Sequence, residues 1–334
     1  MKKQIKKALL VGINHYQGGA EDLEGCIEDA ESMAQILRYN YTPYGAKPEP
    51  NFECTLLKSS DEADKNITRI QLKKEIKKLF EDPDADVVLL YFSGHGYENS
   101  LGGYLITPDV EEYEEGVSFI EIMAHANHAK DKEVFIILDC CNSGNLGRMT
   151  IAENQLVELR KGVSIMTASN ADQSALDTRK GGVFTKLVCN ALQGGNADIF
   201  GQVTFFHVYR HVEKMLGAWE QRPTFKINTS NSVILRKSEP KLAYETFRKM
   251  IDYFPKVDYD FKLDPAFEPT ENQSDSEKER IFSDLQKMAN TNLVVPVGEE
   301  HMYYAAVRSK SCRLTPVGKQ YWQLLKNELL TSNS

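Results

Sequence analysis

Short runs of apolar residues alternate with longer segments of helical period through the first two thirds of the chain. Most of these runs are unbroken rather than alternately apolar and polar, which indicates strands that are buried on both faces. The predicted strands are 7–13, 52–57, 86–92, 133–140, 163–167 and 232–235, and the predicted helices are 28–39, 69–80, 119–129, 183–192 and 204–218. This order predicts an α/β domain with a mainly parallel sheet and helices on both faces.

The last third of the chain follows a different pattern, which begins after Pro240. A helical stretch at 242–253 leads into residues 256–276, which are rich in Asp, Pro, Glu and Ser and are typical of an irregular connector. Beyond it we expect a helix from a capping box of Ser276 and Glu279 to residue 288, strands at 293–297 and 302–307, and a helix from Thr315 to residue 330. The predicted parts are a main domain at 1–238, a helix and connector at 239–275, and a small α+β domain at 276–334.

Charge and cysteine content argue against a polyanion-binding protein and against a secreted, disulfide-linked one. The 334 residues include 40 Lys and Arg against 48 Asp and Glu, so the surface as a whole is not suited to bind a polyanion. Six cysteines without repeated spacing, two of them adjacent, are typical of reduced thiols rather than of a disulfide framework. The apolar run at 8–13 is too short for a secretion signal, and no segment is long enough to span a membrane. We therefore expect a cytoplasmic globular protein without membrane contact.

Two of the predicted strands end in residues that can carry out chemistry. His95 follows the strand at 86–92 and lies between two glycines, which are expected to let the backbone turn sharply. Cys141 follows the strand at 133–140. Because an open parallel sheet binds its ligands where the strands deliver their carboxyl ends, we expect His95 and Cys141 to meet there. The alternative for His95 taken alone is a histidine whose hydrogen bonds are satisfied in a turn.

The alternation of side chains along a strand distinguishes the two adjacent cysteines. Asp139 and Cys141 are expected on one face, and Cys140 on the other, where it would be a small core residue. Cys141 also leads into the turn-forming residues 142–144, which would expose it. A zinc site is disfavoured, because ligating cysteines are usually separated by two residues or more and come in two such pairs.

Residues 91–96 around His95 and 139–144 around Cys141 resemble the two catalytic motifs of the metacaspases and related bacterial caspase-like peptidases of clan CD, family C14. The resemblance covers about residues 5 to 237, and several ordered motifs matching together are more specific than any one alone. The further matching segments are 11–16, 25–30, 168–175, Phe184-Thr185 and Arg222-Pro223. At Asn142 the sequence departs from the metacaspases, which commonly carry His there, and this leaves the subfamily open.

The resemblance implies a caspase-like fold and a cysteine endopeptidase that works with a dyad. Cys141 would attack the scissile carbonyl as a thiolate, and His95 would act first as base and then as acid toward the leaving amine. The backbone N–H groups of Gly96 and Cys141 would form the oxyanion hole. A catalytically silent caspase-like scaffold is the alternative from another class.

The resemblance also implies specificity for a basic residue before the cut. Asp29, Ser93 and Asp139 match the positions that line the acidic pocket of the metacaspases, and carboxylates in a partly desolvated pocket select Arg or Lys. The simpler interpretation is that Asp29 is a favourable acid in the first turn of a helix and that Asp139 caps a turn.

The C-terminal residues 276–334 resemble a small winged-helix unit. We expect this unit to contact a regulatory protein, because its last helix carries Lys319 and Lys326 but little other basic character; a DNA-binding regulator stays the alternative.

No cofactor or metal is expected. The sequence has no calcium loop of the Asp-x-Asp-x-Asp-Gly kind, and the resemblance to metacaspases leaves activation by calcium open. A role in regulated bacterial cell death or defence follows from family analogy alone.

Overall fold

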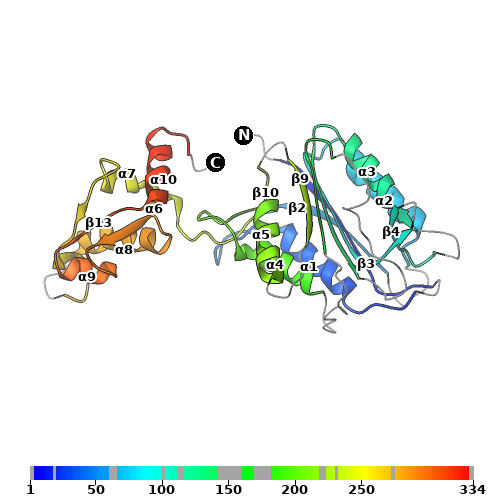
Figure 1. Cartoon of the computed structure of the whole chain (residues 1–334), viewed down its shortest axis with the longest axis horizontal. Coiled ribbons are helices and arrows are strands. Elements are labelled where there is room, and N and C mark those ends of the chain that lie inside the picture. Colours follow the sequence, from blue (N-terminus) through cyan, green and yellow to red (C-terminus); the bar gives the residue numbers. More distant parts are fainter. Residues whose placement is uncertain are drawn as a thin grey trace. The chain divides into compact units, whose positions relative to one another are not determined.

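The structure is a computed structural model that describes residues 4–17, 20–59, 66–99, 102–110, 116–141, 159–168, 182–217, 223–229, 232–271 and 275–330, with the backbone alone at Glu98 and Cys141. The chain divides into two compact units (Figure 1), one of residues 1–197 and 202–239 and the other of residues 198–201 and 240–334. No helix within these ranges is long and apolar enough to cross a membrane. Each unit has its own buried core.

The main sheet of the larger unit has the strand order β2-β1-β3-β6-β7-β9, and β4 and β5 extend it beside β3. Neighbours in this order are parallel except β7 and β9, which are antiparallel. The unbroken apolar runs therefore form a mainly parallel sheet, as the sequence predicts. The strands are β1 Lys6–Ile13, β2 Phe52–Ser59, β3 Val87–Asn99, β4 Gly102–Leu105, β5 Val117–Ser118, β6 Glu133–Cys141, β7 Val163–Thr167 and β9 Thr224–Asn228.

The strand predicted at 232–235 is present at Ile234–Lys237, but it does not join the main parallel sheet. β10, Ile234–Lys237, pairs antiparallel with β8, Gln202–Thr204, in a separate two-stranded sheet. The strand beside β7 is instead β9, whose residues are only half-buried or exposed. Because an edge strand does not need an unbroken apolar run, its sequence gave no signal of the kind used for the buried strands.

Helices cover both faces of this sheet (Figure 1): α1, α4 and α5 lie on one side, and α2 and α3 on the other. Successive residues of β3 alternate between the two cores, with Leu89 in the core under α1 and Leu90 in the core under α2. Each core seals one face, which accounts for the unbroken apolar runs. The helices are α1 Cys26–Arg38, α2 Arg69–Glu81, α3 Phe119–His128, α4 Val183–Asn190 and α5 Phe205–Leu216, with a π-helical turn, η2, at Ala191–Gly195.

The smaller unit packs short helices around a three-stranded antiparallel sheet of order β11-β13-β12. Its core includes Leu242, Phe254 and Phe267, so the segment before α8 shares the core of the helices and strands that follow. The elements are α6 Tyr244–Arg248, α7 Met250–Tyr253, β11 Phe261–Lys262, the 3₁₀ turn η4 Pro265–Phe267, α8 Ser276–Asn290, β12 Val294–Val297, α9 Met302–Val307, β13 Ser311–Leu314 and α10 Pro316–Lys326.

Two details of the smaller unit differ from the sequence prediction. Residues 302–307 form the helix α9 rather than a strand, and Met302, Ala305 and Ala306 are buried at the i, i+3, i+4 spacing of a helix face. Helix α8 is capped by Asp275, whose carboxylate accepts hydrogen bonds from the backbone N–H groups of Glu277 and Lys278, rather than by a box of Ser276 and Glu279. The predicted cap of α10 is correct, because Thr315 Oγ1 accepts from the N–H of Gly318 at 2.9 Å.

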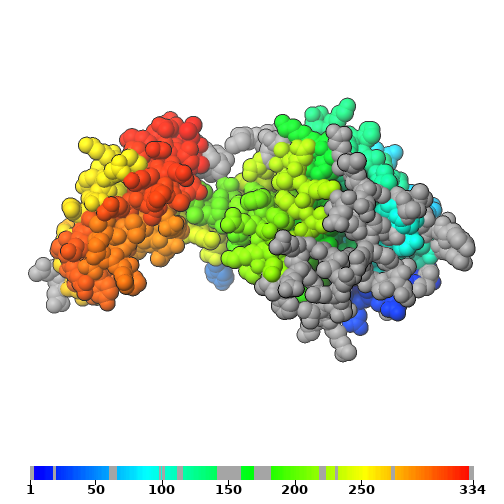
Figure 2. Space-filling model, in the orientation of Figure 1, coloured from blue at the N-terminus to red at the C-terminus, as the bar shows by residue number. Residues whose placement is uncertain are grey.

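Polar side chains tie the helices of the smaller unit together. The buried Asp284 of α8 accepts hydrogen bonds on Oδ2 from Lys249 at 2.7 Å and from the hydroxyl of Tyr253 at 2.8 Å. Trp322 of α10 donates from Nε1 to the carbonyl of Phe254 at 2.6 Å. This last bond joins α10 to the end of α7, and Figure 2 shows the red surface of α10 directly beside the yellow surface of the preceding helices.

Candidate active site

The register of β3 and β6 sets the positions of the predicted histidine and cysteine. The two strands are parallel neighbours, and the α-carbon of His95 is paired with that of Cys141. Paired positions on neighbouring strands are about 5 Å apart. The backbone therefore brings positions 95 and 141 together at the carboxyl end of the sheet. The side chain of Cys141 and the following residues 142–158, including Asn142, lie outside the described part of the chain.

The glycines around His95 do not make the turn that the sequence suggests. Strand β3 continues through them to Asn99 and pairs with β4, so that Gly96 lies opposite Leu105. Gly94 has a different role, because a Cβ atom there would lie only 2.7 Å from the hydroxyl oxygen of Tyr16. Glycine thus leaves the space that Tyr16 occupies beside the strand.

His95 is held by two residues that the sequence prediction did not include, Tyr16 and Glu21. The Tyr16 ring lies 4.6 Å from the imidazole, centroid to centroid, and its hydroxyl oxygen accepts the backbone N–H of His95 at 2.7 Å. The imidazole is completely buried, and its Nε2 lies 2.7 Å from the carbonyl oxygen of Glu21. Because a carbonyl only accepts, Nε2 must carry the proton. Nδ1 then has a lone pair, and it has no hydrogen-bond partner among the described residues.

The neighbouring Cys140 is a core residue. It is buried in the core under α2 and α3, together with Leu90 and Leu138. Burial raises the pKa of the Cys140 thiol well above its usual value, and the negative charge of Asp139 adds to this, so the thiol stays protonated and unreactive. The five cysteines whose side chains are described are all free thiols.

The three predicted pocket residues lie close together. Asp29, in the first turn of α1, and Asp139, near the end of β6, are each 5% exposed, and Ser93 is paired with Asp139 across the sheet. A Cβ atom at Gly182 would lie 2.6 Å from Oδ2 of Asp139 and 3.4 Å from Oδ2 of Asp29. The two carboxylates therefore converge on the same point. Ser93 is buried as well.

The start of helix α4 supplies the hydrogen bonds that these acids accept. The N–H of Gly182 donates to Asp29 at 3.0 Å, and the hydroxyl of Thr185 donates to Asp139 at 2.7 Å. The positive end of the helix dipole favours negative charge at this point. Asp29 and Asp139 therefore satisfy donors that the first turn of a helix leaves open. Thr185 was noted in the sequence only as part of a motif pair, because its partner lies 46 residues away.

Burial dominates the electrostatics of the pair. It raises the pKa of Asp29 to about 7; the hydrogen bond from Gly182 opposes the rise, and the charge of Asp139 adds to it. Burial also raises the pKa of Asp139, against the hydrogen bonds from Thr185. The charge of Lys186 also lowers the pKa of Asp29, but among the described residues the favourable contacts do not offset burial at either carboxylate, so a positive side chain placed between them would be attracted.

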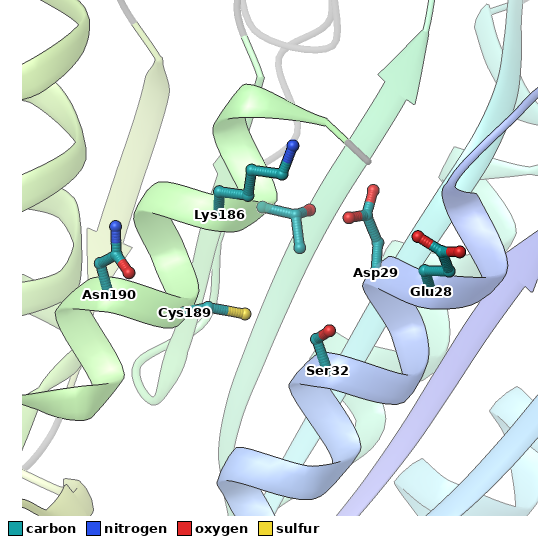
Figure 3. A pocket seen from close by; sticks show the side chains of 7 residues that line it. Glu28, Asp29, Ser32, Lys186, Cys189 and Asn190 are labelled. Carbon is teal, nitrogen blue, oxygen red and sulfur yellow. The ribbon is translucent and has the colours of Figure 1, made fainter. Parts of the chain in front are cut away.

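A pocket of about 150 Å³ opens beside Asp29, between α1 and α4 (Figure 3). Residues of both helices line it: Glu28, Asp29 and Ser32 from α1, and Thr185, Lys186, Cys189 and Asn190 from α4. Burial raises the pKa of the Cys189 thiol to about 12, so this cysteine is not a nucleophile. Among the described residues, no group of three or more His, Cys, Asp or Glu side chains is arranged to hold a metal ion.

Comparison with known proteins agrees with this fold. A family model described as the caspase domain matches residues 5–234. Metacaspase-7 of Arabidopsis thaliana is 27% identical over 156 residues, which are 42% of this chain and 35% of that protein. Metacaspase-1 of Kluyveromyces lactis is 27% identical over 159 residues, which are 42% and 34%. The chain thus covers well under half the length of either relative.

A solved structure of a protein from Geobacter sulfurreducens shares the fold, with a TM-score of 0.50 and 17% identity over 71% of this chain and 98% of the other. The family model covers most of the chain, from the first strand to the start of β10. The fold and the family match agree, and the chain belongs to the caspase-domain family of cysteine peptidases, Peptidase C14.

Proposed function

We propose that this protein is a cysteine endopeptidase that cleaves peptide bonds after Arg or Lys, with Cys141 as nucleophile and His95 as base. The observation that carries the proposal is the register of β3 and β6, which pairs position 95 with position 141 and, two residues earlier, Ser93 with Asp139. A nucleophile and base beside an acidic pocket is the arrangement that cleavage after a basic residue requires.

The hydrogen bonds of His95 support its role as the base. Nε2 donates to the carbonyl of Glu21, so Nδ1 is left to accept a proton from the thiol of Cys141. The thiolate attacks the scissile carbonyl, and the protonated imidazole then returns the proton to the leaving amine. The developing oxyanion is assigned to the backbone N–H groups of Gly96 and Cys141.

The uncompensated charge of Asp29 and Asp139 supports the choice of Arg or Lys. Both carboxylates are buried and their pKa values are raised, so an ammonium or guanidinium group would improve the environment of both. An acidic residue in the same place would add a third negative charge, which is strongly unfavourable in a buried site.

The test is cleavage of fluorogenic peptides that differ only in the residue before the cut: Arg, Lys, Gln or Asp. The wild type should cleave the Arg and Lys peptides and spare the other two. Cys141→Ala should lower kcat/KM by about a thousandfold or more. Cys140→Ala is the matched control, since it removes a thiol from the adjacent core position, and it should keep most of the activity.

The same variants distinguish the alternatives. Covalent labelling of the wild type but not of Cys141→Ala by an arginyl chloromethylketone supports both the nucleophile and the basic pocket. A preference for the Asp peptide refutes the assigned specificity. Neither cleavage nor labelling in the wild type would identify a catalytically silent scaffold and refute the proposal.

A further inference from the structure

Three buried side chains from different elements form a chain of hydrogen bonds that ends on the acid pair. The hydroxyl of Tyr91 on β3 lies 2.6 Å from Oγ1 of Thr185 on α4, and this Oγ1 lies 2.7 Å from Oδ2 of Asp139 on β6. Tyr91 and Thr185 are almost completely inaccessible to solvent, and Asp139 is buried. The contacts join residues 94 and 46 positions apart in sequence, so this is a tertiary arrangement rather than a local turn.

The chemistry of hydroxyl groups fixes the direction of this chain. A threonine hydroxyl has one proton, and here it is donated to the carboxylate of Asp139. Thr185 must then accept from the phenol of Tyr91. Burial raises the pKa of Tyr91, and the negative charges of Asp139 and Asp29 add to this, so the phenol keeps its proton and remains a donor. Both hydrogen bonds thus point toward the carboxylate and polarise each other.

Within the described part of the chain, the hydrogen bonds to Asp139 all come from Thr185, through its hydroxyl and its backbone N–H. Asp29, by contrast, is held by the amide of Gly182. A backbone amide survives any side-chain substitution, whereas the hydroxyl of Thr185 does not. The backbone N–H of Thr185 stays when this side chain changes, so the hydroxyl is the part of the support of Asp139 that a substitution at position 185 can remove.

We infer that Thr185 is a positioning residue for substrate recognition: it orients the carboxylate of Asp139 toward the basic side chain before the scissile bond, and Tyr91 orients Thr185. The inference rests on the proposed function and assigns no contact between Thr185 and the substrate. A fixed carboxylate matters most for Arg, whose planar guanidinium binds a carboxylate through two parallel hydrogen bonds. It matters less for Lys, whose ammonium is a point charge.

The test compares Thr185→Val, which keeps the shape and removes the hydroxyl, with Thr185→Ser, which keeps the hydroxyl. Each variant is assayed on the Arg and Lys peptides and, separately, for the rate at which iodoacetamide alkylates Cys141, followed by mass spectrometry. Thr185→Val should raise KM for the Arg peptide about tenfold, as expected for one hydrogen bond to a charged group. Its KM for the Lys peptide should rise less, and kcat and the alkylation rate should stay near those of the wild type. Thr185→Ser should restore KM for Arg.

Tyr91→Phe should give a smaller rise in KM for Arg, and in combination with Thr185→Val it should add little, because both act on one carboxylate. Equal losses on both peptides together with slower alkylation in Thr185→Val would mean that the hydroxyl only supports the fold, and would overturn the inference. Unchanged kinetics in Thr185→Val would overturn it as well. If the wild type is alkylated but cleaves neither peptide, the proposed function is refuted. This outcome differs from the two above, in which the wild type is active and only the role of Thr185 is refuted.

Discussion

Asp29→Asn should stabilise the larger unit and weaken the proposed activity. Asp29 is 5% exposed, and burial raises its pKa from 3.8 to about 7, even though the N–H of Gly182 donates to it. The substitution keeps the volume of the side chain and an oxygen that can accept from Gly182. It removes the charge, and with it the cost of burying that charge.

The magnitude follows from the pKa. Each pKa unit corresponds to about 1.4 kcal/mol, so a rise from 3.8 to about 7 makes ionised Asp29 cost roughly 4 kcal/mol in the folded state. The folded protein holds this proton more tightly than the unfolded chain. The protonated carboxyl group of Asp29 therefore makes its full contribution to stability below about pH 4, which is its pKa in the unfolded chain. This contribution is lost as the pH rises to about 7, its pKa in the folded protein. The Asn side chain does not titrate.

The assay is urea unfolding followed by circular dichroism at a series of pH values, with Cys141→Ala as the common background so that self-cleavage cannot intervene. Asp29→Asn should exceed this background in stability by up to about 4 kcal/mol at pH 8 and by little at pH 4. All other titrating groups are shared, so the difference reports Asp29 together with its interaction with Asp139. A difference that does not change with pH, or a less stable variant at pH 8, would refute the reasoning. In the active protein, the same substitution should raise KM for the Arg peptide.

Three further predictions concern other parts of the molecule. Asp284→Ala should lower the stability of the smaller unit by about 2 kcal/mol in calorimetry, because it removes two hydrogen bonds to a buried carboxylate. Burial alone would raise the pKa of Asp284, but those bonds hold it below the usual value, so its contribution should be present above about pH 4 and lost at lower pH. Gly94→Ala should lower kcat/KM about tenfold or more, since its Cβ would displace Tyr16 from beside the imidazole, while the melting temperature tests for unfolding. Iodoacetamide at pH 8 should modify Cys141 and spare Cys140, whose burial raises its pKa; peptide mapping that finds modified Cys140 would contradict this.

The parts of the fold that the sequence predicts are those encoded by local pattern. Apolar runs identified five strands of the main sheet; four of them, β1, β3, β6 and β7, are mostly buried on both faces, whereas β2 is an edge strand with exposed positions. The edge strand β9 lacks that pattern. Residues 302–307 were mistaken for a strand because their aromatic and β-branched residues favour strands, whereas the burial of Ala305 and Ala306 favours a helix.

The candidate site shows the same division. The closeness of positions 95 and 141 follows from the general rule that parallel strands end at one edge. The partners of His95 do not follow from it, because the carbonyl of Glu21 is a backbone group, and no residue type marks it in the sequence. The continuation of β3 through Gly94 and Gly96 depends on pairing with β4, which local propensity for a turn cannot reveal.

Two helix starts in this chain distinguish a structural cap from a binding site. Asp275 caps α8, and the backbone hydrogen bonds that it accepts lower its pKa, as expected when a helix start fully compensates an exposed carboxylate. Asp29 accepts a comparable bond from Gly182 at the start of α4, yet its pKa is raised to about 7. A second buried carboxylate beside a helix cap only makes the cap less favourable, because like charges repel. Asp139 is such a neighbour of Asp29. The pair therefore carries more negative charge than α4 can compensate, which favours a site that is completed by a cation from outside the chain.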